Sequence, residues 1–106
     1  MEVNLDNVNV VHNEEASRFE LHVDGLPSLL TYRRFPGFIV FDHTEVPEAL
    51  EGHGLAAKLA GVALDFARAN HLRVVPLCPY VSNFIHKHME YQDLVSSDDL
   101  QKLKSR

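Results

Sequence analysis

The spacing of apolar side chains changes once along this sequence, and that change limits the folds that the chain can adopt. In the first half, apolar residues alternate with polar ones, as Phe19, Leu21 and Val23 do, and a period of two is typical of β-strands. From Gly54 to Asn70 the apolar residues recur every three or four positions, which is the period of an amphipathic α-helix. Strands followed by a helical region predict an α+β fold.

Four strands are predicted in the first half, joined by short turns. Turn residues stand at Asn13-Glu14-Glu15, Asp24-Gly25 and Pro36-Gly37, and turns this short connect antiparallel neighbours. The last segment, Phe38 to Phe41, is apolar on both faces and predicts a strand that is buried on both sides. The four predicted strands are residues 8–12, 18–24, 26–35 and 38–41.

The second half predicts two helices separated by one strand. The long helix covers Gly54 to Asn70, the strand covers Leu72 to Leu77 before Pro79, and the short helix covers Val81 to Met89. The order β-β-β-β-α-β-α predicts a mainly antiparallel sheet, with one βαβ crossover between the fourth and fifth strands and the long helix packed on the sheet. We expect a single domain over residues 1–106, with its core in residues 8–95 and a polar tail in residues 96–106.

Composition excludes several classes of partner. The chain has 106 residues, and its 15 acidic residues against 10 basic ones give a net charge of −5. This balance disfavours nucleic-acid binding, because phosphate contacts need clustered Lys and Arg. No apolar run approaches the ~20 residues that cross a bilayer, and no signal-peptide pattern is present. The single cysteine, Cys78, cannot form an intramolecular disulfide, so we expect a cytoplasmic protein with no membrane partner, as a monomer or weak homodimer.

A pair of glycines stands directly before the long helix. Gly52 and Gly54 can adopt positive φ and let a ligand approach the backbone closely. The first turn of a helix presents unpaired N–H groups and the positive end of the helix dipole, which suits a pyrophosphate. The spacing lacks the lysine of a P-loop and the third glycine of a dinucleotide fingerprint. A lone G-x-G is also compatible with a plain turn.

Three motifs in this part of the chain resemble a known family. Pro47-x-x-Leu-x-Gly-x-Gly-Leu-Ala resembles the coenzyme A pyrophosphate loop of the GNAT superfamily of N-acetyltransferases. The set of motifs, in the same order, is similar to that of the small stand-alone GNAT-like family over residues 8–95, which implies a minimal GNAT fold without the helices that usually build the acceptor pocket. The motifs are His43-Thr44-Glu45-Val46-Pro47, Val75-Pro76-Leu77-Cys78-Pro79-Tyr80 and His88-x-Glu90-Tyr91-x-Asp93-Leu94-Val95.

The resemblance implies that acetyl-coenzyme A is bound as a cosubstrate and that no metal is needed. Backbone amides would hold the pyrophosphate. The pantetheine arm would lie along a strand end in the way that an added β-strand does. Glu51 stands where the superfamily usually has Arg or Gln, and an acid is unfavourable beside phosphates. The implied binding residues are Gly52, His53, Gly54, Leu55 and Ala56 for the pyrophosphate, Thr44, Glu45 and Val46 for the pantetheine arm, Asn83 and Lys87 on the short helix, and Tyr80 before that helix.

Three residues are candidates for the chemistry. The resemblance implies that Cys78 lies at the acyl site, where it could form an acetyl-cysteine or simply be a small buried side chain. His43 and Glu45 are two apart and would face the same way on a strand. Either could take the proton of the incoming ammonium, or both could be ordinary surface residues. Tyr80 and Tyr91 could protonate the departing thiolate or serve only in packing.

We therefore interpret the sequence as an acetyl-CoA-dependent N-acetyltransferase acting on an amine of a small molecule or a protein. The alternative is a module that binds coenzyme A or another protein without catalysis, because fold does not establish chemistry. A zinc domain is disfavoured, since His86-x-His88 has no second ligand motif near it.

Overall fold

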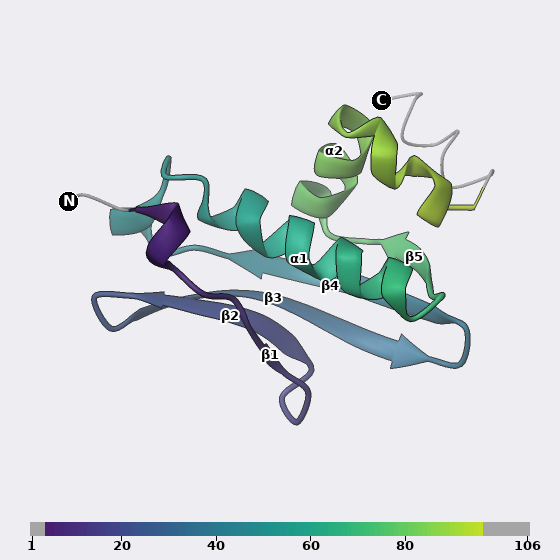
Figure 1. The fold of residues 1–106 in the computed structure, drawn as a ribbon, viewed down its shortest axis with the longest axis horizontal. Helices are drawn as coiled ribbons and strands as arrows, with labels where there is room; N and C mark the ends of the chain where they lie inside the picture. The colour runs from purple at the N-terminus through teal and green to yellow at the C-terminus, as the bar shows by residue number, and fades with distance from the viewer. Residues whose placement is uncertain (1–3, 97–106) are drawn as a thin grey trace.

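The computed structural model describes residues 4–96, and these form a five-stranded sheet with two α-helices (Figure 1). Three short 3₁₀ turns connect or extend these elements. The strands are β1 (Val11–Asn13), β2 (Arg18–Val23), β3 (Leu26–Phe35), β4 (Phe38–Glu45) and β5 (Arg73–Pro76); the helices are α1 (Leu55–Ala69) and α2 (Pro79–Lys87); the 3₁₀ turns are η1 (Leu5–Asn7), η2 (Glu48–Leu50) and η3 (Met89–Leu94).

The strands lie in the sheet in chain order, β1-β2-β3-β4-β5. The first four are antiparallel neighbours, and β5 is parallel to β4. A parallel pair needs a crossover connection, and α1 supplies it. The predicted α+β class, the element order and the βαβ crossover are therefore confirmed.

The hydrophobic core lies between one face of the sheet and the two helices. Inward-facing side chains of β2, β3 and β4 pack against the apolar stripe of α1, which runs along the sheet in Figure 1. We call this the inner face of the sheet, and the opposite one the outer face. The fully buried side chains include Phe19, Leu21, Leu30, Ile39, Phe41, Leu55, Leu59 and Leu64.

The first strand is shorter than the predicted residues 8–12. Only Val11–Asn13 pairs with β2, and the chain before it forms η1. The Lys58 ammonium on α1 donates hydrogen bonds to the backbone carbonyls of Leu5 and Val8. These bonds hold the N-terminal segment on α1, so it does not extend along β2.

Other boundaries also differ from the prediction, most clearly those of β4 and α2, and α2 ends at Lys87 rather than Met89. β4 runs to Glu45 rather than Phe41, because its polar second half continues to pair with β3. α2 begins at Pro79 rather than Val81, since proline at the first helical position gives up no hydrogen bond. Of the predicted polar tail, residues 97–106 lie outside the described residues.

Candidate functional site

The loop that enters α1 has the backbone conformation predicted for its glycines. Gly52 has φ +83° and Gly54 has φ +80°, both in the region that L side chains avoid. Gly54 is the N-cap of α1, and a Cβ placed there would lie 3.3 Å from Leu5 Cδ1. Both glycines are therefore required by the path of the chain, independently of any ligand.

The first turn of α1 presents unpaired amides at this loop. The Lys58 amide donates to the Gly54 carbonyl over 3.1 Å, as the first helical bond of α1. The amides of Leu55, Ala56 and Ala57 precede it and have no partner within the helix. Together with the helix dipole they make this end of α1 favourable for an anion.

A pocket of about 240 Å³ opens at the same helix end. It lies between the loop after β4, the start of α1 and the first turn of α2. The pocket brings together six of the residues predicted to bind the cofactor. Its lining consists of Val46, Leu50, Glu51, Gly52, Gly54, Leu55, Ala56, Ala57 and Tyr80.

Glu51 contributes a carboxylate to this lining. It follows η2 as its C-cap residue, where its amide donates to the Glu48 carbonyl. The side chain is exposed at the pocket rim. An acid at this position opposes the attraction that the helix end has for phosphates.

Cys78 lies where β4 and β5 separate. The last register pair is Phe41 with Pro76, and the Cys78 amide donates to the Phe41 carbonyl over 2.9 Å. The Thr44 hydroxyl is 3.1 Å from the Cys78 sulfur. The thiol side chain is only 3% exposed, so it is part of the wall between β4 and α2. From residue 42 onward, no strand among residues 4–96 pairs with β4 on this edge.

His43 and Glu45 face the same way on β4, as their spacing predicted. His43 Nε2 is 4.0 Å from Glu45 Oε2, and each side chain is 63% exposed. Neither lines the pocket. Both side chains are open to solvent, so an incoming ammonium could come within hydrogen-bond reach of either one.

Asp42 is a polar residue of this region that the sequence analysis missed. The register pairs Thr31 with His43 and Tyr32 with Phe41, which leaves Asp42 as the extra residue of a β-bulge. The Asp42 carboxylate accepts hydrogen bonds from Thr31 Oγ1 at 2.6 Å and Arg33 Nε at 3.2 Å. The only sequence feature that could have pointed to Asp42 is its place at the start of the polar run from Asp42 to Glu45.

The remaining predicted binding residues lie around the pocket without lining it. Asn83 and Lys87 are exposed on α2, three and seven residues after Tyr80, and so share its side of the helix. His53 is half-buried in the loop between the two glycines. Burial raises the pKa of Tyr80, which keeps its phenol protonated at neutral pH.

Tyr91 lies in a different place from Tyr80. Its hydroxyl donates to Asp65 Oδ1 on α1 over 2.9 Å, and it belongs to η3. Burial and this hydrogen bond raise its pKa. Tyr91 joins η3 to α1 and does not line the pocket.

Within residues 4–96, no group of three or more His, Cys, Asp or Glu side chains could hold a metal ion. No helix of the same residues is long and apolar enough to cross a membrane.

Fold and pocket together define a class of protein. Residues 18–94 match the family model of the GCN5-related N-acetyl-transferases, so the chain belongs to this family. The sequence is similar to Protein NATD1 of Bos taurus, with 33% identity over 76% of this chain and 74% of that protein. Protein NATD1 of Mus musculus is 31% identical over 76% of each chain. The fold is similar to the solution structure of a GCN5-like protein from Staphylococcus aureus, with a TM-score of 0.68 and 28% identity over 87% of this chain and 91% of that one.

Proposed function

We propose that this chain binds acetyl-coenzyme A at the start of α1 and transfers the acetyl group to an amine. The observation that carries the proposal is the pocket formed by the two positive-φ glycines, the first turn of α1 and Tyr80. It combines unpaired amides for an anion with an apolar wall for the rest of the ligand.

The residues present fit the chemistry of coenzyme A. The amides of Leu55, Ala56 and Ala57 would donate to the pyrophosphate oxygens. Val46 lines the same pocket directly after β4, whose last residues are not paired with β5, and the amide-rich pantetheine arm would bind along this strand edge. Asn83 and Lys87 would contact the nucleotide end from the exposed side of α2.

The transfer that we propose is direct. An ammonium acceptor first loses a proton to His43 or Glu45, both of which are open to solvent. The neutral nitrogen then bonds to the acetyl carbon and gives up its second proton to solvent, while the carbon–sulfur bond breaks with its electron pair on sulfur and the coenzyme A thiolate leaves. Backbone N–H groups of the unpaired β4 edge would stabilise the charge on the carbonyl oxygen. Tyr80 is the protonated group available to the thiolate.

Cys78 is assigned a packing role in this scheme. A nucleophilic thiol must reach the thioester, but the Cys78 side chain is 3% exposed and its sulfur contacts the Thr44 hydroxyl. Free cysteines in such surroundings behave as small apolar side chains.

The proposal is tested by incubating the full chain with acetyl-coenzyme A and a panel of small amines and lysine peptides. The readouts are release of the coenzyme A thiol and the mass of each product. We expect thiol release that depends on an acceptor and a matching acetylated product. Binding of coenzyme A without any acetylated product would instead support a non-catalytic binding module.

A further inference from the structure

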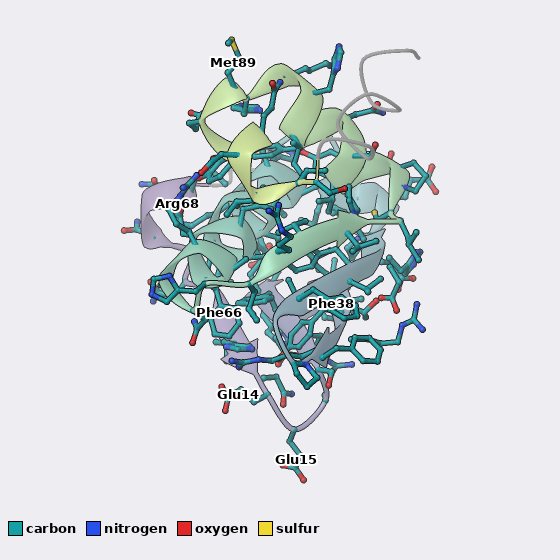
Figure 2. All side chains as sticks on the ribbon, turned by 90° about the vertical axis from the view of Figure 1, so that its right-hand side faces the viewer. Glu14, Glu15, Phe38, Phe66, Arg68 and Met89 are labelled. Atoms are coloured by element: carbon teal, nitrogen blue, oxygen red, sulfur yellow. The ribbon has the colours of Figure 1, made fainter. Side chains whose placement is uncertain are left out.

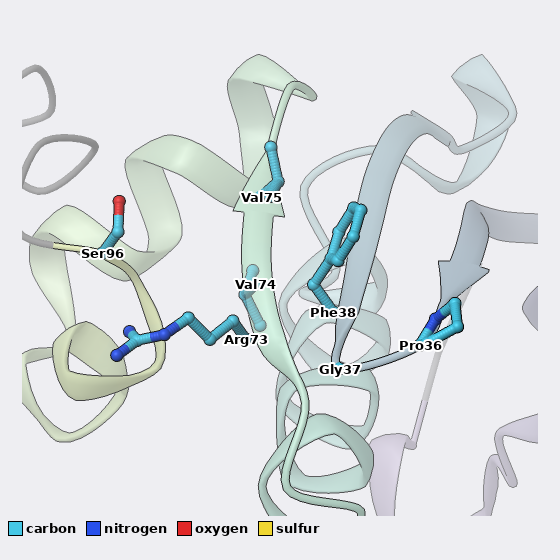
Figure 3. A pocket seen from close by; sticks show the side chains of 7 residues that line it. All are labelled: Pro36, Gly37, Phe38, Arg73, Val74, Val75 and Ser96. Carbon is cyan, nitrogen blue, oxygen red and sulfur yellow. The ribbon is translucent and has the colours of Figure 1, made fainter.

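A second pocket, of about 390 Å³, lies at the other end of β4 and β5 (Figure 3). Its lining is mainly apolar. In Figure 3, Phe38 and Val75 lie over the two neighbouring strands, and Arg73 extends toward the segment that carries Ser96. The lining residues are Pro36, Gly37, Phe38, Arg73, Val74, Val75 and Ser96.

This groove opens on the outer face of the sheet. The register pairs Phe38 with Arg73 and Val40 with Val75, and register partners share one face. The residues between them, such as Ile39, are buried in the core on the inner face. Figure 2 agrees, since Phe38 of β4 and Phe66 of α1 lie on opposite sides of the sheet.

The outer face also carries the polar residues at the open end of β4. Arg33 is the register partner of Val40, and it donates to the Asp42 carboxylate. Asp42 therefore faces the same side as Phe38. The groove and the proposed acyl-transfer end of β4 are two parts of one surface, four residues apart on a single strand, or about 13 Å.

The two ends of this surface carry different kinds of side chain. At the groove end, Arg73 has no carboxylate partner among the residues that the structure describes. Phe35 and Phe38 stack there with ring centroids 4.8 Å apart and remain 40% and 37% exposed. At the other end stand two carboxylates: Asp42, which pairs with Arg33, and Glu45, which lies 4.0 Å from His43. The surface thus runs from Arg73 through apolar side chains to a polar end that carries both carboxylates and the Arg33 guanidinium.

We propose that this surface docks a polypeptide acceptor, which carries an apolar and acidic anchor at a fixed distance from the amine that is acetylated. The proposal rests on the proposed function. The acidic anchor pairs with Arg73, its apolar neighbour packs on Phe38 and Val75, and the lysine ammonium approaches Asp42 and Glu45. An extended peptide spans the interval with about four residues. A small amine cannot occupy both ends, so the arrangement favours a protein over a metabolite.

The probe is a synthetic peptide with a blocked N-terminus, one central lysine, and Phe-Asp about four residues from the lysine on each side. Its matched peptide has Arg in place of each Asp. The assay measures kcat/KM for acetylation by the full chain. We expect wild-type protein to prefer the acidic peptide by about tenfold, and the preference to shrink as salt is added.

Substitutions in the protein test which residues cause the preference for the acidic peptide. Arg73→Glu reverses the preference toward the arginine peptide, whereas Phe38→Ala lowers kcat/KM for both peptides alike. Arg18→Glu is the matched control, because Arg18 lies on the same face at β2 and pairs with Glu20. It keeps the wild-type preference. Thermal melting of each variant shows that it is folded.

The outcomes separate this proposal from the one on which it rests. Equal kcat/KM for the two peptides in wild-type protein would overturn docking at this surface and leave acetyl transfer intact. A preference that is unchanged in Arg73→Glu would likewise overturn docking at this surface and leave acetyl transfer intact. Absence of coenzyme A binding in a parallel calorimetric titration would overturn the proposed function itself.

Discussion

Among the residues that line the pocket at the start of α1, Glu51 is the one whose charge opposes a phosphate group. Replacing Glu51 with Gln removes this charge and keeps the size of the side chain. A charge at a helix N-terminus contributes about 0.5–1 kcal/mol. We therefore expect Glu51→Gln to bind coenzyme A about two- to fivefold more tightly in a calorimetric titration.

The control for this change is Glu48→Gln. Glu48 is exposed in η2, close in sequence to Glu51, but does not line the pocket. Its substitution should leave the affinity for coenzyme A unchanged. An equal gain in both variants would mean that net charge alone, rather than the position of Glu51, controls the affinity.

Cys78 provides a second prediction for a single residue. Because the side chain is 3% exposed and packed in the core, Cys78→Ala should lower the free energy of unfolding by about 1 kcal/mol. Direct transfer predicts that the variant still acetylates amines. It also predicts that intact-mass spectrometry of wild-type protein with acetyl-coenzyme A finds no protein adduct. An acetyl adduct that disappears with turnover in Cys78→Ala would establish the covalent route.

The glycines of the pocket could be predicted from the sequence, but Asp42 could not. Gly52 and Gly54 were found because few residues other than glycine suit a turn that enters a helix. Asp42 reaches the outer face through a β-bulge between β3 and β4. The position of a bulge depends on pairing between distant segments, and no local pattern encodes it.

At the scale of elements, the N-terminal segment is held on α1 by one side chain. Lys58 is half-buried and donates to the carbonyls of Leu5 and Val8. Lys58→Met keeps the apolar stem and removes both bonds. We expect a loss of about 2 kcal/mol in the free energy of unfolding, measured by denaturant titration, and faster hydrogen exchange at the Val8 amide, which donates to Leu5.

Lys87→Met is the matched control for the N-terminal segment. Lys87 is exposed on α2, and surface substitutions of this kind change stability by less than about 0.5 kcal/mol. Similar losses of unfolding free energy in the two lysine variants would show that the hydrogen bonds from Lys58 contribute nothing specific to the fold.

The elements with clear periodicity were predicted well. β3 has its predicted bounds, and α1 starts and ends one residue inside its own. The first strand was predicted too long, because Val8 and Val10 alternate like a strand while Lys58 holds that segment elsewhere. The fourth was predicted too short, since its polar second half gives no apolar signal. Tertiary contacts decide both cases.

At the scale of the whole molecule, His12 joins the sheet to the end of α1. Its ring stacks on Phe19 with centroids 4.2 Å apart and meets Phe66 at 4.5 Å, and its Nε2 is 2.6 Å from the Tyr32 hydroxyl. Burial lowers the pKa of His12 below 6.5, against a smaller upward effect of Glu14.

This lowered pKa predicts how stability depends on pH. Above about pH 6.5, His12 is neutral in both the folded and unfolded chain. As the pH falls below that value, the unfolded chain binds the proton first, so the free energy of unfolding falls. The stability difference between wild-type protein and His12→Gln should therefore be largest near pH 8 and shrink toward about pH 5. A stability difference between the two proteins that stays constant over this pH range would contradict a lowered pKa for His12.

The central claim, that the glycine loop and the start of α1 bind coenzyme A, is tested most directly by calorimetric titration of three proteins. Gly52 and Gly25 have φ +83° and +77°, and a Cβ at either meets nothing within 4 Å. Alanine therefore introduces similar backbone strain at both, but only Gly52 lines the pocket. We predict that wild-type protein and Gly25→Ala bind coenzyme A alike, whereas Gly52→Ala binds about tenfold more weakly. No binding by wild-type protein, or equal weakening in both variants, would contradict the claim.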